Sequence, residues 1–216
     1  MKSRYLFAAA PLLVPVFGMA GDHDGWFVRP YVGFSQMSDL TGTTTNLGAV
    51  DGVSNIDIDS GFNAGIGLGY RYNRNVAVEV AWEYRSNDSS VTLADGSVFP
   101  EGNYASNMFF LNGFYFLDTE SAKWSPYIGG GLSWMQEIDI DLEQAATQTS
   151  LSGDGDFGYQ VFAGIDYSID DAWSVGGQIR YGSTTGINLE GEGNNGTYSD
   201  LDYRPTTLQV GLTYRY

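Results

Sequence analysis

The sequence contains no cysteine, one histidine and only 10 lysine and arginine residues in 216 positions. Without cysteine there are no disulfides and no thiolate metal ligands, so backbone pairing and burial must stabilise the fold. The basic residues stand against 26 acidic ones, which argues against nucleic acid as a partner, because phosphate binding requires Lys and Arg. The single histidine, His23, precedes the first regular segment. Since histidine is the usual catalytic base near neutral pH, we do not expect an enzyme.

No run of about 20 apolar residues is present, so no segment is expected to cross a bilayer as a helix. The longest apolar run, 5–17, follows two basic residues and precedes Gly18-Met19-Ala20, which is the order of a secretory signal. The sequence therefore predicts a cleaved signal peptide over 1–20 and one mature domain over 21–216. Without the two basic residues of the signal, 8 basic residues remain against 26 acidic ones.

Glycine and aromatic residues are abundant, and they occur in segments where every second residue is apolar. In the segment 62–72, Phe62, Ile66 and Leu68 share one face, whereas the other face is mostly glycine. Alternation over about ten residues is typical of transmembrane strands that face lipid and lumen in turn. Eight segments fit this pattern: 26–37, 62–72, 76–85, 106–117, 125–136, 157–168, 173–182 and 206–216.

The connections between these segments alternate in length. The short ones are 73–75, 118–124 and 169–172, and the long ones are 38–61, 86–105, 137–156 and 183–205. Outer-membrane barrels have tight periplasmic turns and long outer loops, and aromatic girdles at both interfaces, where outward Trp and Tyr of these segments also fall. The fold class predicted is all-β, an eight-stranded antiparallel transmembrane up-and-down β-barrel in the cell outer membrane, with both termini in the periplasm.

Three segments carry a resemblance to a known family. The first strand Gly25–Phe34, the fifth strand Trp124–Leu132 and the final strand Leu208–Tyr216 resemble the OmpA-like and opacity-protein superfamily of small Gram-negative outer-membrane barrels. The resemblance implies a porin-family surface antigen that contacts outer-membrane lipid and lipopolysaccharide. It also implies that the terminal Tyr216 serves as the signal for the barrel-assembly machinery, although Phe is the commoner last residue.

The lumen of the predicted barrel receives several charged side chains. Eight strands leave an interior that side chains fill, so a wide pore is not expected. A buried charge costs several kcal/mol unless it is paired, so the inward charges should form an ion-pair network. Its predicted members are Arg29, Arg71, Glu79, Glu83, Arg85, Asp166, Arg180 and Arg215. Such a network either plugs the barrel and fixes the strand register, or acts as a gate for small ions.

The four long connections hold 17 acidic residues. Continuing the inward alternation beyond the membrane places Asp57, Asp59, Glu137, Asp139, Asp141, Glu143, Asp154, Asp156, Glu190 and Glu192 on the lumen side, and Ile56, Ile58, Ile138, Ile140 and Leu142 outside. A carboxylate ring at the mouth would concentrate cations, and oxygen ligands suit Ca²⁺ or Mg²⁺. Asp139, Asp141, Asp154 and Asp156 are the candidate metal ligands. The alternative is that these acids are simply solvated.

Two functions follow as hypotheses. The first is a structural surface scaffold, whose acidic outer loops contact cations, lipopolysaccharide, or a ligand on a host or another cell. The second is a narrow porin for small ions, or an OmpW-like path for small hydrophobic molecules. Apart from Ca²⁺ or Mg²⁺ at the mouth, the sequence indicates no cofactor.

Overall fold

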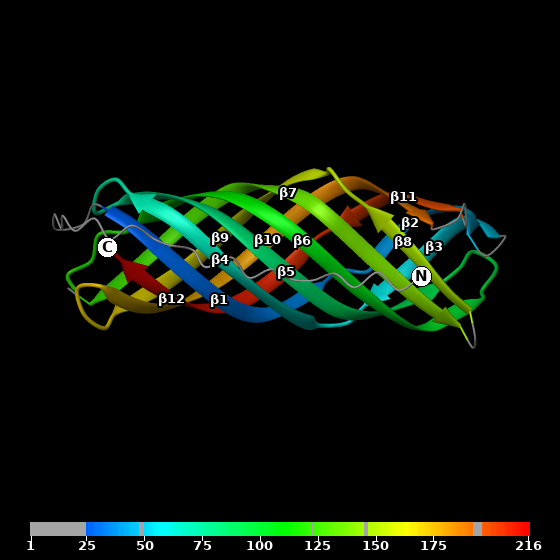
Figure 1. The fold of residues 1–216 in the computed structure, drawn as a ribbon, viewed down its shortest axis with the longest axis horizontal. Helices are drawn as coiled ribbons and strands as arrows, with labels where there is room; N and C mark the ends of the chain where they lie inside the picture. The colour runs from blue at the N-terminus through cyan, green and yellow to red at the C-terminus, as the bar shows by residue number, and fades with distance from the viewer. Residues whose placement is uncertain (1–24, 48–49, 122, 145–146, 192–195) are drawn as a thin grey trace, which may run out of the picture.

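The computed structural model describes residues 25–47, 50–121, 123–144, 147–191 and 196–216, and these form an all-β protein (Figure 1). The predicted signal peptide lies outside the described residues. No helix in the described part of the chain has the length and apolar character needed to cross a membrane. The strands are β1 (Gly25–Met37), β2 (Leu40–Leu47), β3 (Val50–Ile58), β4 (Gly61–Arg71), β5 (Val76–Thr92), β6 (Val98–Phe116), β7 (Trp124–Gln144), β8 (Thr147–Gly153), β9 (Phe157–Ser168), β10 (Trp173–Gly191), β11 (Thr197–Tyr203) and β12 (Pro205–Arg215).

Eight of these strands close into a ring. β1, β4, β5, β6, β7, β9, β10 and β12 pair in this order, each antiparallel to the next, and β12 pairs with β1. Gly33 of β1, for example, lies opposite Asn63 of β4 and Gln209 of β12. The predicted eight-stranded antiparallel barrel is therefore confirmed. We call this ring the membrane barrel.

A second ring continues the first along the same axis, at the end far from the C-terminus, on the right in Figure 1. We call the end of the molecule near the C-terminus the lower end and the opposite end the upper end. Here β11, β2, β3, the upper parts of β5, β6 and β7, then β8 and the upper part of β10 pair in order, and β10 closes on β11. We call this ring the distal barrel. The prediction that 38–61, 86–105, 137–156 and 183–205 are loops is wrong for most of these residues, because continued pairing satisfies their backbone N–H and C=O groups.

The membrane barrel is apolar on its outer surface. Phe34, Leu132 and Leu208, for instance, expose 75%, 63% and 63% of their surface. Exposed tryptophans mark its two rims, with Trp26, Trp124 and Trp173 at the lower end and Trp82 and Trp134 at the upper end. An apolar band between aromatic girdles is the surface that a bilayer solvates. The side chains on the inner face of the same strands are largely polar or charged.

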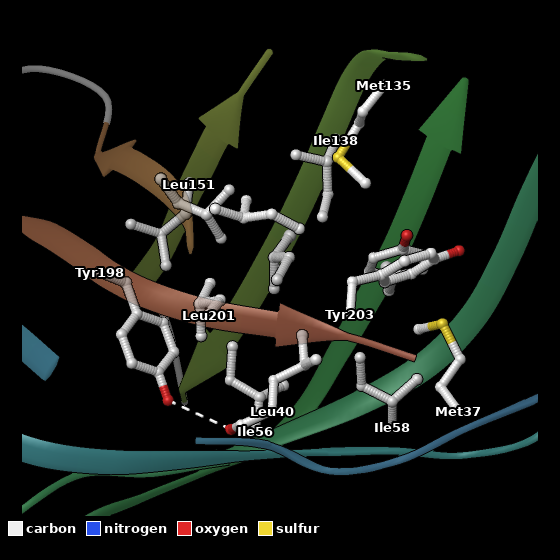
Figure 2. Packing of buried hydrophobic residues seen from close by; sticks show 14 of the residues in the cluster. Met37, Leu40, Ile56, Ile58, Met135, Ile138, Leu151, Tyr198, Leu201 and Tyr203 are labelled. Atoms are coloured by element: carbon white, nitrogen blue, oxygen red, sulfur yellow. Dashed lines mark hydrogen bonds between the residues drawn. The ribbon is translucent and has the colours of Figure 1, made fainter. Parts of the chain in front are cut away.

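The distal barrel has the opposite arrangement. Its interior holds a fully buried apolar cluster, and its outer surface is mostly Thr, Ser, Asn, Asp and Glu. Figure 2 shows Ile138, Leu151, Leu201 and Ile56 pointing into the same interior from strands around the ring. The hydroxyl of Tyr198 lies in this core and donates a hydrogen bond to the Ser54 carbonyl at 2.6 Å. Burial raises the pKa of Tyr198 above its ordinary value.

In β7 and in the segments around β2, β3, β8 and the upper part of β10, the change of arrangement takes place where strand regularity is broken. In β7, Met135 lies opposite Met108 and Glu137 lies opposite Asn107, so Gln136 is an extra residue in a β-bulge. Both Gln136 and Glu137 are exposed, and the buried positions change from odd numbers below the bulge to even numbers above it. Equivalent switches occur at Ser38–Asp39, Asp59–Ser60, Asp154–Asp156 and Thr185–Gly186.

These switches overturn the predicted orientation of the acidic residues. Ile138, Ile140 and Leu142 are 0% exposed, as is Ile56, and Ile58 is 6% exposed, so they line the interior rather than the outer surface. The acids that alternate with them face outward: Asp57, Asp59, Glu137 and Glu190 are exposed, and Asp139 and Asp141 are partly exposed. The side chains of Glu143 and Glu192 lie outside the described residues. The prediction of a carboxylate ring facing the lumen is wrong, because it assumed unbroken alternation.

Candidate functional site

The lower part of the lumen is filled by an ion pair, amides and a cluster of buried aromatic side chains, namely Phe27, Phe114, Phe116, Tyr127 and Phe162. Arg29 Nη2 lies 2.9 Å from Glu79 Oε2, and both side chains are buried. Asn112 donates to Glu79 Oε1 at 3.1 Å, and Gln160 donates to the Asn112 amide oxygen at 2.6 Å. The Arg29 guanidinium also lies 4.6 Å from the ring centroid of Phe114. These contacts connect strands from opposite sides of the barrel, so they fill its cross-section.

A second polar layer lies above the first. Glu83 forms ion pairs with both Arg85 and Arg180, and all three side chains are at most 4% exposed. Asn63 donates to Glu83 at 3.1 Å, and Arg85 donates to the Ser35 hydroxyl at 2.7 Å. One carboxylate thus receives donors from β4, β5 and β10. Desolvated charges are stable only when paired and hydrogen-bonded in this way.

The structure brings together five of the eight predicted network residues in ion pairs: Arg29, Glu79, Glu83, Arg85 and Arg180. The other three, Arg71, Asp166 and Arg215, lie nearer the C-terminal end. With Arg29 they line a cavity of about 20 Å³. Arg71 lies 3.9 Å from the ring centroid of Phe116, and Arg215 donates to the Ser174 hydroxyl at 3.1 Å.

Above the polar layers the interior becomes apolar. Met37, Met108, Met135 and the stacked rings of Tyr104 and Tyr203 begin a cluster that continues to the distal end. At the start of this cluster a cavity of about 10 Å³ lies beside Arg85, Phe110 and Tyr203. These two cavities, both formed by described residues, are each about the size of one water molecule. In this conformation the described side chains therefore fill both lumens.

The predicted metal ligands lie on the outer wall. Asp139 and Asp141 are on β7, whereas Asp154 and Asp156 are in the turn between β8 and β9. Desolvation and the neighbouring Asp154 carboxylate raise the pKa of Asp156. Among the described residues, no three Asp, Glu or His side chains are arranged to hold a metal ion. Calcium or magnesium binding at this position stays a prediction without a preformed ligand set.

Sequence reasoning missed the amides that complete the lumen layers, namely Asn63 and Asn112, and it missed the apolar distal core. The core had a detectable signal. Segments beyond the upper aromatic girdle still alternate Ile or Leu with Asp, and leaving those apolar side chains in contact with water would be unfavourable.

Tyr216 lies beside Trp26, whose carbonyl oxygen accepts a 3.0 Å hydrogen bond from the Tyr216 N–H. Its role in assembly stays a prediction.

A closed barrel with an apolar outer band and a charged lumen defines an integral β-barrel protein of the outer membrane. Residues 8–216 match the family model for the outer membrane protein beta-barrel domain, and the chain belongs to this family. The resemblance to small outer-membrane barrels and the predicted outer-membrane location are confirmed.

Individual relatives agree with this family. The chain is 21% identical over 170 residues to outer membrane protein W of Vibrio cholerae, covering 76% of this chain and 77% of that protein. The structure of OprG from Pseudomonas aeruginosa is similar with a TM-score of 0.65 and 16% identity, covering 91% of this chain and 99% of OprG. Outer membrane protein W of Escherichia coli has a TM-score of 0.51 and 17% identity, covering 91% of this chain and 100% of that protein. At these identities the solved structures support the fold alone.

Proposed function

We propose that the protein is a non-conducting surface scaffold of the outer membrane. In this proposal the membrane barrel anchors the chain, and the distal barrel projects outward and presents its acidic wall to cations, lipopolysaccharide or a ligand on another cell. The termini then lie in the periplasm, where the barrel-assembly machinery recognises Tyr216. No catalytic role is part of the proposal.

The observation that carries the proposal is the filled interior of both barrels. Two ion-pair layers occupy the membrane barrel, and an apolar cluster with many side chains at 0% exposure occupies the distal barrel. An ion would have to break buried ion pairs and then enter an apolar core. Each of these steps costs roughly several kcal/mol. This arrangement favours a scaffold over an ion pore.

Conductance tests the proposal directly. The refolded chain in a planar bilayer should produce no single-channel steps above the leak of the lipid. As a check that the assay detects opening, the variant Glu83→Ala, which removes the carboxylate between Arg85 and Arg180, should be measured beside it. Regular current steps from the unaltered protein would contradict a non-conducting scaffold.

The apolar interior of the distal barrel favours a second candidate, a path for small hydrophobic molecules. An apolar solute would not have to break ion pairs to enter this half, although the packed side chains must move aside. Cells that make the protein would then take up an apolar fluorescent probe faster than cells that lack it. Equal uptake rates would remove this candidate and leave the scaffold.

A further inference from the structure

The cavity of about 10 Å³ beside Arg85, which we call the upper cavity, is lined by hydrogen-bond donors. Two guanidinium groups, those of Arg85 and Arg180, are part of its lining. None of the described residues in this lining is acidic, whereas Asp166 lines the cavity at the lower end. The remaining polar side chains of the upper cavity carry hydroxyl or amide groups: Ser133, Tyr159, Gln160, Ser183, Thr184 and Tyr203.

The buried charges beside the upper cavity do not balance. Arg85 and Arg180 both pair with one carboxylate, that of Glu83. In the lower layer, by contrast, Arg29 and Glu79 pair one to one. The described residues of the second polar layer therefore carry one positive charge in excess. A desolvated charge is strongly unfavourable unless an opposite charge lies beside it.

Some donors of the cavity lining are also unused. The Arg85 Nε–H and the Tyr203 hydroxyl have no hydrogen-bond partner among the described residues, although each residue is only 1% exposed. The Arg180 guanidinium lies 4.9 Å from the ring centroid of Phe110. A guanidinium that stacks on a ring presents its N–H groups at its edge, so they stay available to an acceptor.

Two hydroxyl groups of the lining meet over Gly158. Ser133 of β7 and Thr184 of β10 both lie opposite Gly158 of β9. A Cβ atom at Gly158 would collide with both side-chain oxygens, so only glycine lets these hydroxyls approach each other. Donors from three sources, namely guanidinium, phenol and aliphatic hydroxyl groups, thus surround one small space.

The size of the upper cavity limits what can occupy it. It has room for one water-sized species, so polyatomic anions such as phosphate and sulfate do not fit. A water molecule would fit, but it would supply no negative charge. A monatomic anion is only slightly larger than water, accepts hydrogen bonds from every direction and supplies the missing charge.

We propose that the upper cavity binds a small monovalent inorganic anion such as chloride. Arg85, Arg180 and the Tyr203 hydroxyl donate to the anion, and the hydroxyls of Ser133 and Thr184 complete its shell. The anion makes the second polar layer neutral and ties β5, β7, β10 and β11 together. It is a structural component of the lumen, so the site does not depend on whether the barrel conducts.

Diffraction from crystals of the refolded full chain grown in bromide instead of chloride tests the proposal. Bromide replaces chloride and scatters anomalously, so an anomalous peak is expected in the upper cavity, within hydrogen-bond distance of Arg85 and Arg180. An upper cavity without such a peak would hold water or nothing, and the proposal would be wrong.

Thermal unfolding in detergent measures the affinity in solution. At constant ionic strength, chloride replaces gluconate, which is too large for the cavity, and the midpoint of the unaltered protein should rise with chloride concentration. Arg180→Gln leaves one guanidinium for one carboxylate, and the fitted chloride affinity should fall about tenfold or more. Ser133→Ala removes one neutral donor, and the affinity should fall about threefold.

The matched control is Arg215→Gln, which removes a guanidinium from the lining of the lower cavity. Its chloride affinity should stay within about twofold of the unaltered protein, because the upper cavity keeps all its donors. Equal losses for Arg180→Gln and Arg215→Gln would mean that chloride acts through diffuse attraction, and this would overturn the proposal. A midpoint of the unaltered protein that does not respond to chloride would overturn it as well.

Discussion

Along β7, the membrane barrel and the distal barrel use opposite faces of one strand for their apolar side chains. Below the bulge at Gln136, Leu132 and Trp134 face outward and Ser133 faces inward. Above the bulge, Ile138 and Ile140 face inward. On both sides of this bulge β7 stays paired to β6, so the backbone is shared and only the direction of the apolar face differs.

The difference follows from what surrounds each barrel. Lipid solvates the outer face of the membrane barrel, so most of its apolar side chains can face outward, and its polar side chains must find partners in the lumen. Water surrounds the distal barrel, so burial of Ile and Leu in its interior contributes about 25 cal/mol per Å². In β7 one extra residue is enough to change between these arrangements, because strand side chains alternate with period two. In β5 the inward positions stay odd-numbered from Ala77 to Val91, and only the character of the outward residues changes, from apolar to polar.

The largest effect is expected from deleting Asp139 in β7. The deletion turns Ile140 and Leu142 outward or, if the strand shifts through the bulge, turns Glu137 inward. Either arrangement disrupts the apolar core, and a carboxylate turned into it costs several kcal/mol, roughly. The distal barrel should then be cleaved by a glutamate-specific protease, while the membrane barrel keeps heat-modifiable gel migration.

Deleting Gln136 is the matched control, since it also shortens β7 by one residue. This deletion removes the extra residue of the bulge and leaves Met135 and Ile138 both facing inward, so protease resistance should persist. If the two deletion variants were cleaved by the protease at equal rates, the bulge at Gln136 would not be the feature that changes the direction of the apolar face.

The next largest effect is expected from removing one carboxylate from an ion pair, in the lumen of the membrane barrel and on the surface of the distal barrel. Glu83→Gln leaves Arg85 and Arg180 buried without their carboxylate, which should lower the free energy of unfolding by about 3–5 kcal/mol. The half-exposed pair Asp202–Arg204 of the distal barrel offers the comparison, and Asp202→Asn should cost less than about 1 kcal/mol. Urea unfolding in detergent micelles measures both. Similar midpoints for the two variants would contradict the structural role of the lumen layers.

A smaller effect is expected from truncating one isoleucine in each barrel. Ile140→Ala leaves a cavity in the distal core and should cost about 2–5 kcal/mol. Ile128 faces lipid with 51% exposure, so lipid fills the space left by Ile128→Ala and the cost should be about 1 kcal/mol. Protease accessibility of the distal barrel and urea midpoints together separate the two. A larger loss for the lipid-facing variant would reverse the comparison.

The smallest effect is expected at the distal turn between β5 and β6. The Asp95 carboxylate accepts hydrogen bonds from the hydroxyl and the N–H of Ser97, and these hold the pKa of Asp95 below its ordinary value. A lowered pKa in the folded state contributes stability above the unfolded value, and this is lost as pH falls through the folded pKa. Ser97→Ala should raise the pKa of Asp95 in an NMR titration. An unchanged titration would show that these hydrogen bonds do not favour the ionised form.

The membrane barrel could be predicted from the sequence to a large extent. Alternation over 62–72 and 76–85, with aromatic residues such as Tyr72 and Trp82 towards the two interfaces, identifies strands and their lipid face, because a bilayer requires an apolar band of that length between aromatic girdles. The lumen charges followed from the same alternation. The amide donors Asn63 and Asn112 could not be predicted, because their roles depend on which strands face each other across the closed ring.

The sequence by itself determined that eight strands cross the outer membrane with apolar faces in lipid, since that information lies in local period-two alternation. Only the tertiary structure decided that β2, β3, β8 and β11 continue the wall as a second barrel with Ile138 and Ile140 inside. Alternation gives two faces but does not say which one is inside. That choice depends on bulges such as the one at Gln136, on pairing between residues far apart in the chain, and on whether lipid or water surrounds the strand.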